Sequence, residues 1–512
     1  MKKIYLIYYT FSVMAIASCS HVQKNETAKK PNVIFIYVDD LGYGDVSCYG
    51  AKAVKTPNVD DLAARGIQFT DGHCAAATCT SSRFALLTGS YPFRNNVNML
   101  SGDTPLIIKP EQETIADIFK KGGYTTAVIG KWNLGLGNGN LNWNREIKPG
   151  PLELGFDYSF IIPATPDRVP TVFVENHKVA NLDPNDPITV SYDKRIGTDP
   201  VGLENEEILK LYADPQHSGT LVNGISRIGY MSGGHKAYWK DEEFPNVLTK
   251  KAADFITDNK GKSFFLYFSI PDIHVPRAPN PKFVGKTNLG PRGDAIVQMD
   301  WMTGQIVKKL KELGIENNTI IFFSSDNGPV LNDGYADKSL TNIGNHKPSG
   351  QFRGGKYSAY EAGTRVPTII YWPHKIKPSK SDALFSQVDL LASFAKLIGV
   401  KIQNKETATD SFDMLDVLMG KSNKGRKYLI EEAFTMSIRE DNWKYIAAQS
   451  KTTPDWLMNK NVASGLQKSP QLYDLSKDPK EEKNLAAEMP EKTKALAAQL
   501  LKIMKWPRNS SK

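Results

Sequence analysis

The stretch CTSSR at residues 79–83 places a thiol and a guanidinium four residues apart, at what the sequence predicts to be the start of a helix. The chain has 4 cysteines, and Cys19 lies in an N-terminal apolar segment. Three thiols in a chain of this size do not make a disulfide framework. A bridge between Cys48 and Cys74 would leave Cys79 without a partner. Cys79 is therefore a candidate for chemistry, and Arg83 for stabilising a negative charge beside it.

Four short apolar runs elsewhere in the chain end in polar residues. Each run is rich in β-branched and aromatic residues, as expected for a strand buried on both faces. Segments with apolar residues at three and four spacing lie between them, and this alternation predicts an α/β fold with a parallel sheet covered by helices on both faces. The residues that follow the runs are Asp39 and Asp40, Lys131, His274, and Asp326 with Asn327.

Ligands of open parallel sheets bind beyond the carboxyl ends of the strands, so these residues are expected to meet at one site. A single carboxylate could simply cap the next helix. An adjacent pair such as Asp39 and Asp40 is poorly explained that way, because it crowds like charges together. A cation resolves the conflict, and oxygen ligands favour calcium or magnesium over zinc.

Composition limits the classes of function. The chain has 512 residues, 40% of them hydrophobic, and a net charge of +9. Lysine and arginine are scattered, which argues against a nucleic-acid binder and allows an anionic substrate. We expect one large catalytic domain at 31–405 and a smaller α+β subdomain at 406–512.

The N-terminus has the pattern of an export signal. Lys2 and Lys3 precede the apolar stretch 4–17, which is too short for a stable membrane span. IASC at 16–19, at the end of that stretch, resembles the lipobox of bacterial lipoproteins, with Cys19 as the acylated residue. Cleavage near Ala17 is the alternative. The sequence thus predicts a leader at 1–19, a tether at 20–30, and a periplasmic or outer-membrane lipoprotein held to the membrane only through its lipid.

The run CTSSRFALLTG at 79–89 resembles the signature of type I sulfatases, Cys-x-Pro/Ala-x-Arg followed by Leu-Thr-Gly. The other polar clusters occur in the family's order, and the resemblance covers roughly residues 31 to 510. It implies an alkaline-phosphatase-like fold with a mixed, mostly parallel sheet. It also implies a sulfated glycan as substrate, one calcium ion, and a maturation enzyme that oxidises Cys79 to formylglycine.

The resemblance assigns roles position by position. The hydrate of residue 79 supplies the nucleophile, Arg83 holds it, Lys131 and Lys356 bind sulfate, and His274 protonates the leaving alcohol. The implied calcium ligands are Asp39, Asp40, residue 79, Asp326 and Asn327.

The sequence departs from the family pattern at Asn133, in GKWNLG, where the family has the histidine that takes a proton from the hydrate. Asparagine is not a base near neutral pH. Another base in a subgroup, a slow or trapped enzyme, and a deliberate substitution are three explanations. Ser81 in place of Pro or Ala, and Ala362 in place of Gly, are mild changes.

The substrate is inferred from two stretches, 164–179 and 342–363, which resemble sulfatases that gut Bacteroidetes use on host glycans. Among these sulfatases, the two stretches most resemble the subgroup that removes 3-O-sulfate from galactose. This resemblance implies that His177 recognises the axial O4 of galactose and that Arg353 contacts a neighbouring hydroxyl. Alternatives are a sulfatase for 6-O- or 4-O-sulfated galactose or N-acetylhexosamine, a phosphatase or phosphodiesterase of the same superfamily, and a non-catalytic glycan-binding protein. Asn327, at a position where two-zinc enzymes need a ligand, disfavours the phosphatase.

Overall fold

The computed structural model describes residues 1, 3, 30–139, 141–404, 407–450, 453–458 and 460–505. The predicted leader and tether, including Cys19, lie almost entirely outside these residues, and so does the predicted domain boundary at 405/406. Within the described part of the chain, no helix is long and apolar enough to cross a membrane.

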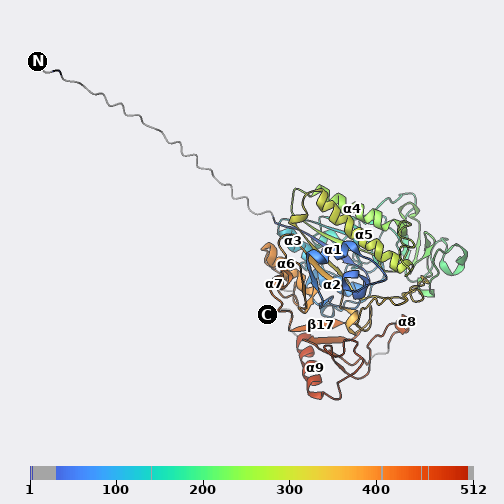
Figure 1. Cartoon of the computed structure of the whole chain (residues 1–512). Coiled ribbons are helices and arrows are strands. Elements are labelled where there is room, and N and C mark those ends of the chain that lie inside the picture. The colour runs from blue at the N-terminus through green and yellow to red at the C-terminus, as the bar shows by residue number, and fades with distance from the viewer. Residues whose placement is uncertain are drawn as a thin grey trace.

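A 10-stranded mixed sheet forms the centre of the molecule (Figure 1), which confirms the predicted α/β class. Its middle strands β13, β1, β12, β4 and β5 are neighbours in that order and run parallel. Antiparallel strands extend the sheet at both edges. The strands in sheet order are β15 (Ser379–Ser381), β2 (Ile67–Phe69), β14 (Thr368–Tyr371), β13 (Thr319–Ser325), β1 (Asn32–Val38), β12 (Phe264–Ile270), β4 (Thr125–Lys131), β5 (Tyr158–Ile162), β6 (Val174–Glu175) and β7 (Lys178–Val179).

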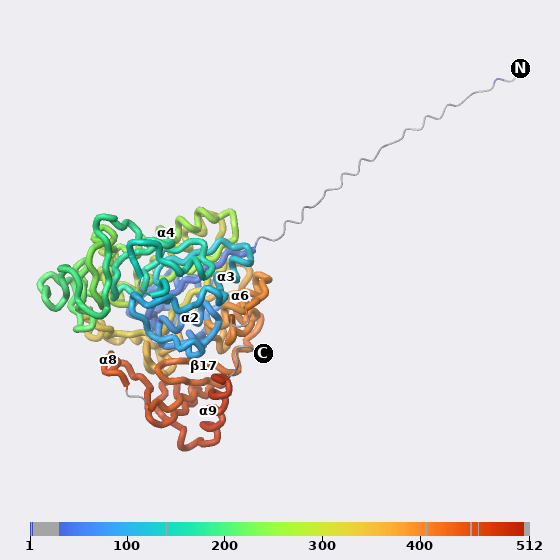
Figure 2. Tube along the Cα trace, turned by 180° about the vertical axis from the view of Figure 1, so that it is seen from behind, coloured from blue at the N-terminus to red at the C-terminus, as the bar shows by residue number. Residues whose placement is uncertain are grey.

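Helices bury both faces of this sheet because side chains alternate along each strand. Phe35 of β1 packs into the core on one face, and Ile36 packs into the core on the other. The first core is covered by α2 (Cys79–Thr88), α3 (Ile115–Lys121) and α6 (Leu390–Ile398), which Figure 2 shows together. The second core is covered by α1 (Pro57–Arg65), α4 (Phe244–Asp258) and α5 (Pro291–Glu312).

The C-terminal part is a smaller α+β unit below the main sheet in Figure 1, as predicted. It contains a four-stranded antiparallel sheet against which α9 (Pro490–Met504) packs. Its elements are β17 (Tyr428–Glu432), β18 (Met436–Glu440), β19 (Trp443–Ile446), α8 (Asp455–Met458) and β20 (Gln471–Asp474). The remaining short elements are β3 (Gly72–His73), β16 (Phe385–Ser386), β8 (Thr189–Ser191), β9 (Leu221–Val222), β10 (Ile225–Ser226), β11 (Tyr230–Ser232) and α7 (Leu415–Leu418).

A buried group of charges joins this subdomain to the main domain. Glu361 of the main domain accepts hydrogen bonds from Arg439 (2.7 Å) and Lys444 (3.1 Å) of the C-terminal sheet. Lys444 also pairs with Glu431 at 3.1 Å, and none of its side chain is exposed. Because unpaired buried charges are costly, these contacts hold the two units in one arrangement.

Candidate active site

The four strands that end in polar residues lie side by side in the order β13, β1, β12, β4. All four are parallel, so their carboxyl ends meet at one edge of the sheet. Asp326 and Asn327 follow β13, and Asp39 and Asp40 follow β1, all fully buried. The structure thus brings the predicted clusters together through topology alone.

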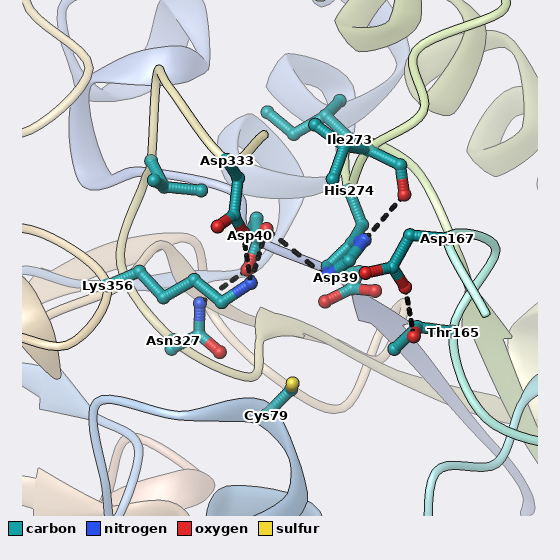
Figure 3. Close-up of polar contacts among 12 residues, drawn as sticks. Asp39, Asp40, Cys79, Thr165, Asp167, Ile273, His274, Asn327, Asp333 and Lys356 are labelled. Atoms are coloured by element: carbon teal, nitrogen blue, oxygen red, sulfur yellow. Dashed lines mark hydrogen bonds and ion pairs between the residues drawn. The ribbon is translucent and has the colours of Figure 1, made fainter. Parts of the chain in front are cut away.

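Helix α2 delivers the cysteine to the same edge. Cys79 is its first residue, and every residue of the helix is buried. One turn later, Arg83 donates through Nε to Asp326 Oδ2 at 2.9 Å and through Nη1 to the carbonyl oxygen of Lys131 at 3.3 Å. Figure 3 shows the sulfur of Cys79 directed toward the carboxylates. Arg83 therefore lies where it can neutralise charge beside residue 79.

Two buried lysines flank the carboxylates. Lys131 Nζ is 2.6 Å from Asp39 Oδ2, and Lys356 Nζ is 3.0 Å from Asp40 Oδ2. Lys356 also lies 3.1 Å from Asp333 Oδ2, a contact seen in Figure 3. Their ammonium groups are thus placed to bind an anion that enters beside residue 79.

The acidic cluster fits a divalent cation. Ligand atoms of Asp39, Cys79 and Asp326 lie within 4.8 Å of one another. Asp39 Oδ1 and Asn327 Oδ1 are buried and lack hydrogen-bond partners. Burial and the neighbouring Asp326 raise the pKa of Asp39 well above its usual value, although Lys131 opposes this. A bound cation would satisfy the orphaned oxygens and relieve the repulsion, and these hard ligands suit calcium or magnesium.

Cys79 itself is not tuned to be a thiolate nucleophile. Burial raises the pKa of its thiol, and Lys131 and Lys356 only partly oppose this shift. Reactive cysteines usually have a lowered pKa. Asn133 Nδ2 lies 3.3 Å from the Cys79 sulfur and donates to Thr80 Oγ1 at 3.0 Å. The amide therefore occupies the position from which a proton could be taken from a group at residue 79.

His274 lies on the other side of the carboxylates. Its Nδ1 donates to the carbonyl oxygen of Val275 at 2.7 Å, and its Nε2 is 4.0 Å from Asp40 Oδ2. Burial first, and then the charge of Lys356, lower the pKa of His274 to about 4. To act as a general acid, His274 must also carry a proton on Nε2. A nearby anionic substrate would raise the pKa of His274 and so favour that protonated form.

A small cleft of about 110 Å³ opens above Cys79, Asn133, His274 and Lys356. Five residues with an acidic, basic or imidazole side chain that the sequence reasoning did not select also line it: Asp167, Arg168, His217, Asp333 and Lys460. The first two lie in the segment after β5 but do not directly follow its last residue, so the strand-end pattern does not mark them. His217 ends a short 3-10 helix, Asp333 and Lys460 lie outside helices and strands, and no local pattern marks these three residues.

Asp167, Arg168 and His217 form one polar cluster at the cleft. Arg168 Nη1 is 3.1 Å from Asp167 Oδ2, and His217 Nε2 is 3.5 Å from the same oxygen. Although burial alone would raise it, Arg168 and His217 hold the pKa of Asp167 well below its usual range. The cluster presents charged donors and an acceptor to whatever enters the cleft.

The two residues predicted to contact the sugar lie elsewhere. His177 occupies the turn between β6 and β7, and its Nε2 is 2.9 Å from Glu153 Oε1. Arg353 donates to the carbonyl oxygen of Glu481 at 2.7 Å, stacks on Tyr360 at 4.1 Å, and borders a separate groove of about 1550 Å³. Neither residue is among the described residues that line the cleft. The prediction that these two side chains contact the sugar therefore stays a prediction, and it would require a sugar that extends beyond this cleft.

Comparison with known proteins agrees with this geometry. The sequence profile of the Sulfatase family matches residues 31–400. An N-acetylgalactosamine-6-O-sulfatase of Bacteroides thetaiotaomicron is 47% identical over 96% of this chain and 97% of its own length. Human arylsulfatase A is 31% identical over 93% of this chain and 88% of its own. A solved structure connected with glycosaminoglycan metabolism in B. thetaiotaomicron superimposes with a TM-score of 0.91 at 47% identity, covering 94% of this chain and 100% of that one.

Proposed function

This chain belongs to the sulfatase family, and we propose that it removes a 6-O-sulfate from a terminal N-acetylgalactosamine of a sulfated glycan. The enzyme is a sulfuric ester hydrolase. The observation that carries the sugar assignment is the 47% identity, over nearly the whole chain, to an N-acetylgalactosamine-6-O-sulfatase. The expectation of galactose 3-O-sulfate has no comparable support, so we favour the 6-O alternative.

Each of the residues around the cleft would have its own role in sulfate ester hydrolysis. A formylglycine hydrate at position 79 would supply two hydroxyl groups on one carbon, and a calcium ion held by Asp39, Asp40, Asp326 and Asn327 would screen negative charge. Lys131 and Lys356 bind the sulfate oxygens, because their ammonium groups converge on the space beside residue 79.

Three further side chains place charges and protons. Arg83 neutralises Asp326 and would hold the formylglycine hydrate at residue 79. His274, fixed through Nδ1 by the carbonyl oxygen of Val275, presents Nε2 to the leaving alcohol and holds the proton that the alcohol takes. Asn133 donates a hydrogen bond to residue 79 but takes no proton there.

The cleft would hold the reacting ester, and the groups on its wall would contact the sugar that carries the ester. Its volume of about 110 Å³ leaves little room beyond the ester. Asp167, Arg168 and His217 provide hydrogen-bonding groups on one wall, where the hydroxyls of a sugar ring would lie. Charged groups that are already buried and fixed discriminate strongly between hydroxyl positions, because a missing partner leaves them unpaired.

The test is a panel of 3-, 4- and 6-sulfated galactose and N-acetylhexosamines, incubated with protein in which formylglycine at position 79 has been verified by mass spectrometry. We expect the highest kcat/KM on 6-sulfated N-acetylgalactosamine. A Cys79→Ala variant controls for contaminating sulfatases. Preference for galactose 3-O-sulfate would restore the original expectation and remove this proposal.

The metal, the maturation of Cys79 and the destination of the protein are part of the same proposal. Elemental analysis should find one calcium per chain, and Asp326→Asn should lower that content. Globomycin, which blocks lipoprotein signal cleavage, should prevent removal of the leader if Cys19 is acylated. Leader removal that continues in its presence would point to cleavage near Ala17.

A further inference from the structure

One carboxylate in the cleft is shared by two lysines from different parts of the chain. Asp333 Oδ2 lies 3.1 Å from Lys356 Nζ, and Asp333 Oδ1 lies 3.1 Å from Lys460 Nζ. The three side chains are between 2% and 7% exposed. Lys460 belongs to the C-terminal subdomain, so this unit contributes a buried charge directly to the catalytic cleft.

The charges around Lys356 balance only when Lys460 is counted. Lys356 contacts two carboxylates, Asp40 at 3.0 Å and Asp333 at 3.1 Å. Asp40 belongs to the proposed metal site, whereas Asp333 has no such partner. Without Lys460, the charge of Asp333 would be compensated by Lys356 alone, the lysine that must bind sulfate. Like charges at this separation repel strongly in a buried site.

The segment that carries Lys460 is fixed to the loop that carries Lys356. Trp456 of α8 packs edge-on against Tyr357, with ring centroids 5.1 Å apart. The Tyr357 hydroxyl lies 3.3 Å from Asp333 Oδ2. Farther along the segment, the backbone NH of Ala359 donates to the carbonyl oxygen of Ser464 at 2.8 Å. The geometry of Lys460 is therefore set by several contacts to the same loop.

From this arrangement we propose that Lys460 is a positioning residue for sulfate binding: it neutralises Asp333 and so leaves Lys356 free to bind the sulfate group. The inference rests on the proposed function only in assigning sulfate to Lys356. It makes the C-terminal subdomain a part of the active site and not only a support for it.

A double-mutant cycle that removes each charge in turn tests the proposal. Lys460→Met should lower kcat/KM about tenfold, mainly through KM, because Asp333 then pairs with Lys356 alone and competes with sulfate for it. Asp333→Asn added to Lys460→Met should restore most of that loss, since the competing charge is then gone, and Lys460→Arg should retain activity. The control is Lys477→Met in the same subdomain, whose side chain is 84% exposed and pairs with Asp474; it should behave as wild type.

A second readout separates positioning from stability and from catalysis. In a Cys79→Ala background, isothermal titration with the sulfated sugar should rank the affinities of the variants in the same order as their kcat/KM values. Thermal melting should show that each variant is folded. The proposal is overturned if Lys460→Met binds and turns over like wild type, or if the double variant is as impaired as Lys460→Met. If wild type fails on 6-sulfated N-acetylgalactosamine, the sugar assignment fails, and the cycle is run on whichever sulfated substrate is hydrolysed.

Discussion

Replacing Asn133 by histidine should speed the release of sulfate from residue 79. The Asn133 amide lies 3.3 Å from the Cys79 sulfur, so an imidazole at this position reaches a group on residue 79. The backbone allows the change, because Asn133 has a φ of 55°, a conformation that histidine also adopts. A positioned general base contributes about 10²- to 10⁴-fold, or about 3 to 5 kcal/mol of the barrier.

The assay follows both products with time. For wild type we expect a rapid burst of desulfated sugar, slow later turnover, and intact protein that carries a sulfo group in the mass spectrum after brief exposure to substrate. Asn133→His should abolish the burst and raise the steady rate, with an acidic limb near the ordinary histidine pKa of about 6.5. Asn133→Ala, which removes the amide without adding a base, is the matched control. Linear sugar release by wild type, with no sulfated protein, would refute the reasoning because another base would then be at work.

Three further predictions concern the metal and stability. Chelation with EGTA should abolish activity and lower the melting temperature, and adding calcium should restore both. The reason is that the buried carboxylates of Asp39, Asp40 and Asp326 repel one another without a cation. An unchanged melting temperature would argue against a metal. Lys444→Met should cost about 3–5 kcal/mol of unfolding free energy in urea titrations, because it removes a buried positive charge that Glu361 and Glu431 share. The exposed Lys477→Met should cost under about 1 kcal/mol, and equal losses would contradict this. Burial raises the pKa of Glu432 from its ordinary 4.5 to about 7. The folded state therefore holds a proton that the unfolded state releases, and unfolding free energy should fall by about 1–3 kcal/mol as the pH rises from 4.5 to 7; Glu432→Gln should flatten this dependence, and an unaltered slope would exclude the group.

The clustering of the candidate site residues was predictable because it depends on local patterns and one topological rule. Asp39 and Asp326 directly follow buried apolar runs, and parallel strands must bring such residues to one edge. Cys79 and Arg83 lie four residues apart on a single helix, so their proximity needs no long-range contact. The fold class followed from the same alternation of strands and helices.

The other residues of the cleft were harder to predict because their positions depend on how distant loops pack. Arg168 follows a strand, but nothing in its neighbourhood distinguishes it from a surface arginine. Lys460 reaches Asp333 only because the C-terminal subdomain docks against the main domain. His177 was chosen by resemblance, yet the β6–β7 turn holds it against Glu153. Sequence periodicity carries no information about such contacts.

The central claim is that residue 79, matured to formylglycine, cleaves a 6-O-sulfate. Its most direct test is ion chromatography of sulfate released from 6-sulfated N-acetylgalactosamine by protein with verified formylglycine, beside Cys79→Ala. For the matured protein, the predicted result is free sulfate equal to the desulfated sugar minus the share still bound to residue 79; for Cys79→Ala it is no sulfate. Release by both proteins, or by neither, would contradict the claim.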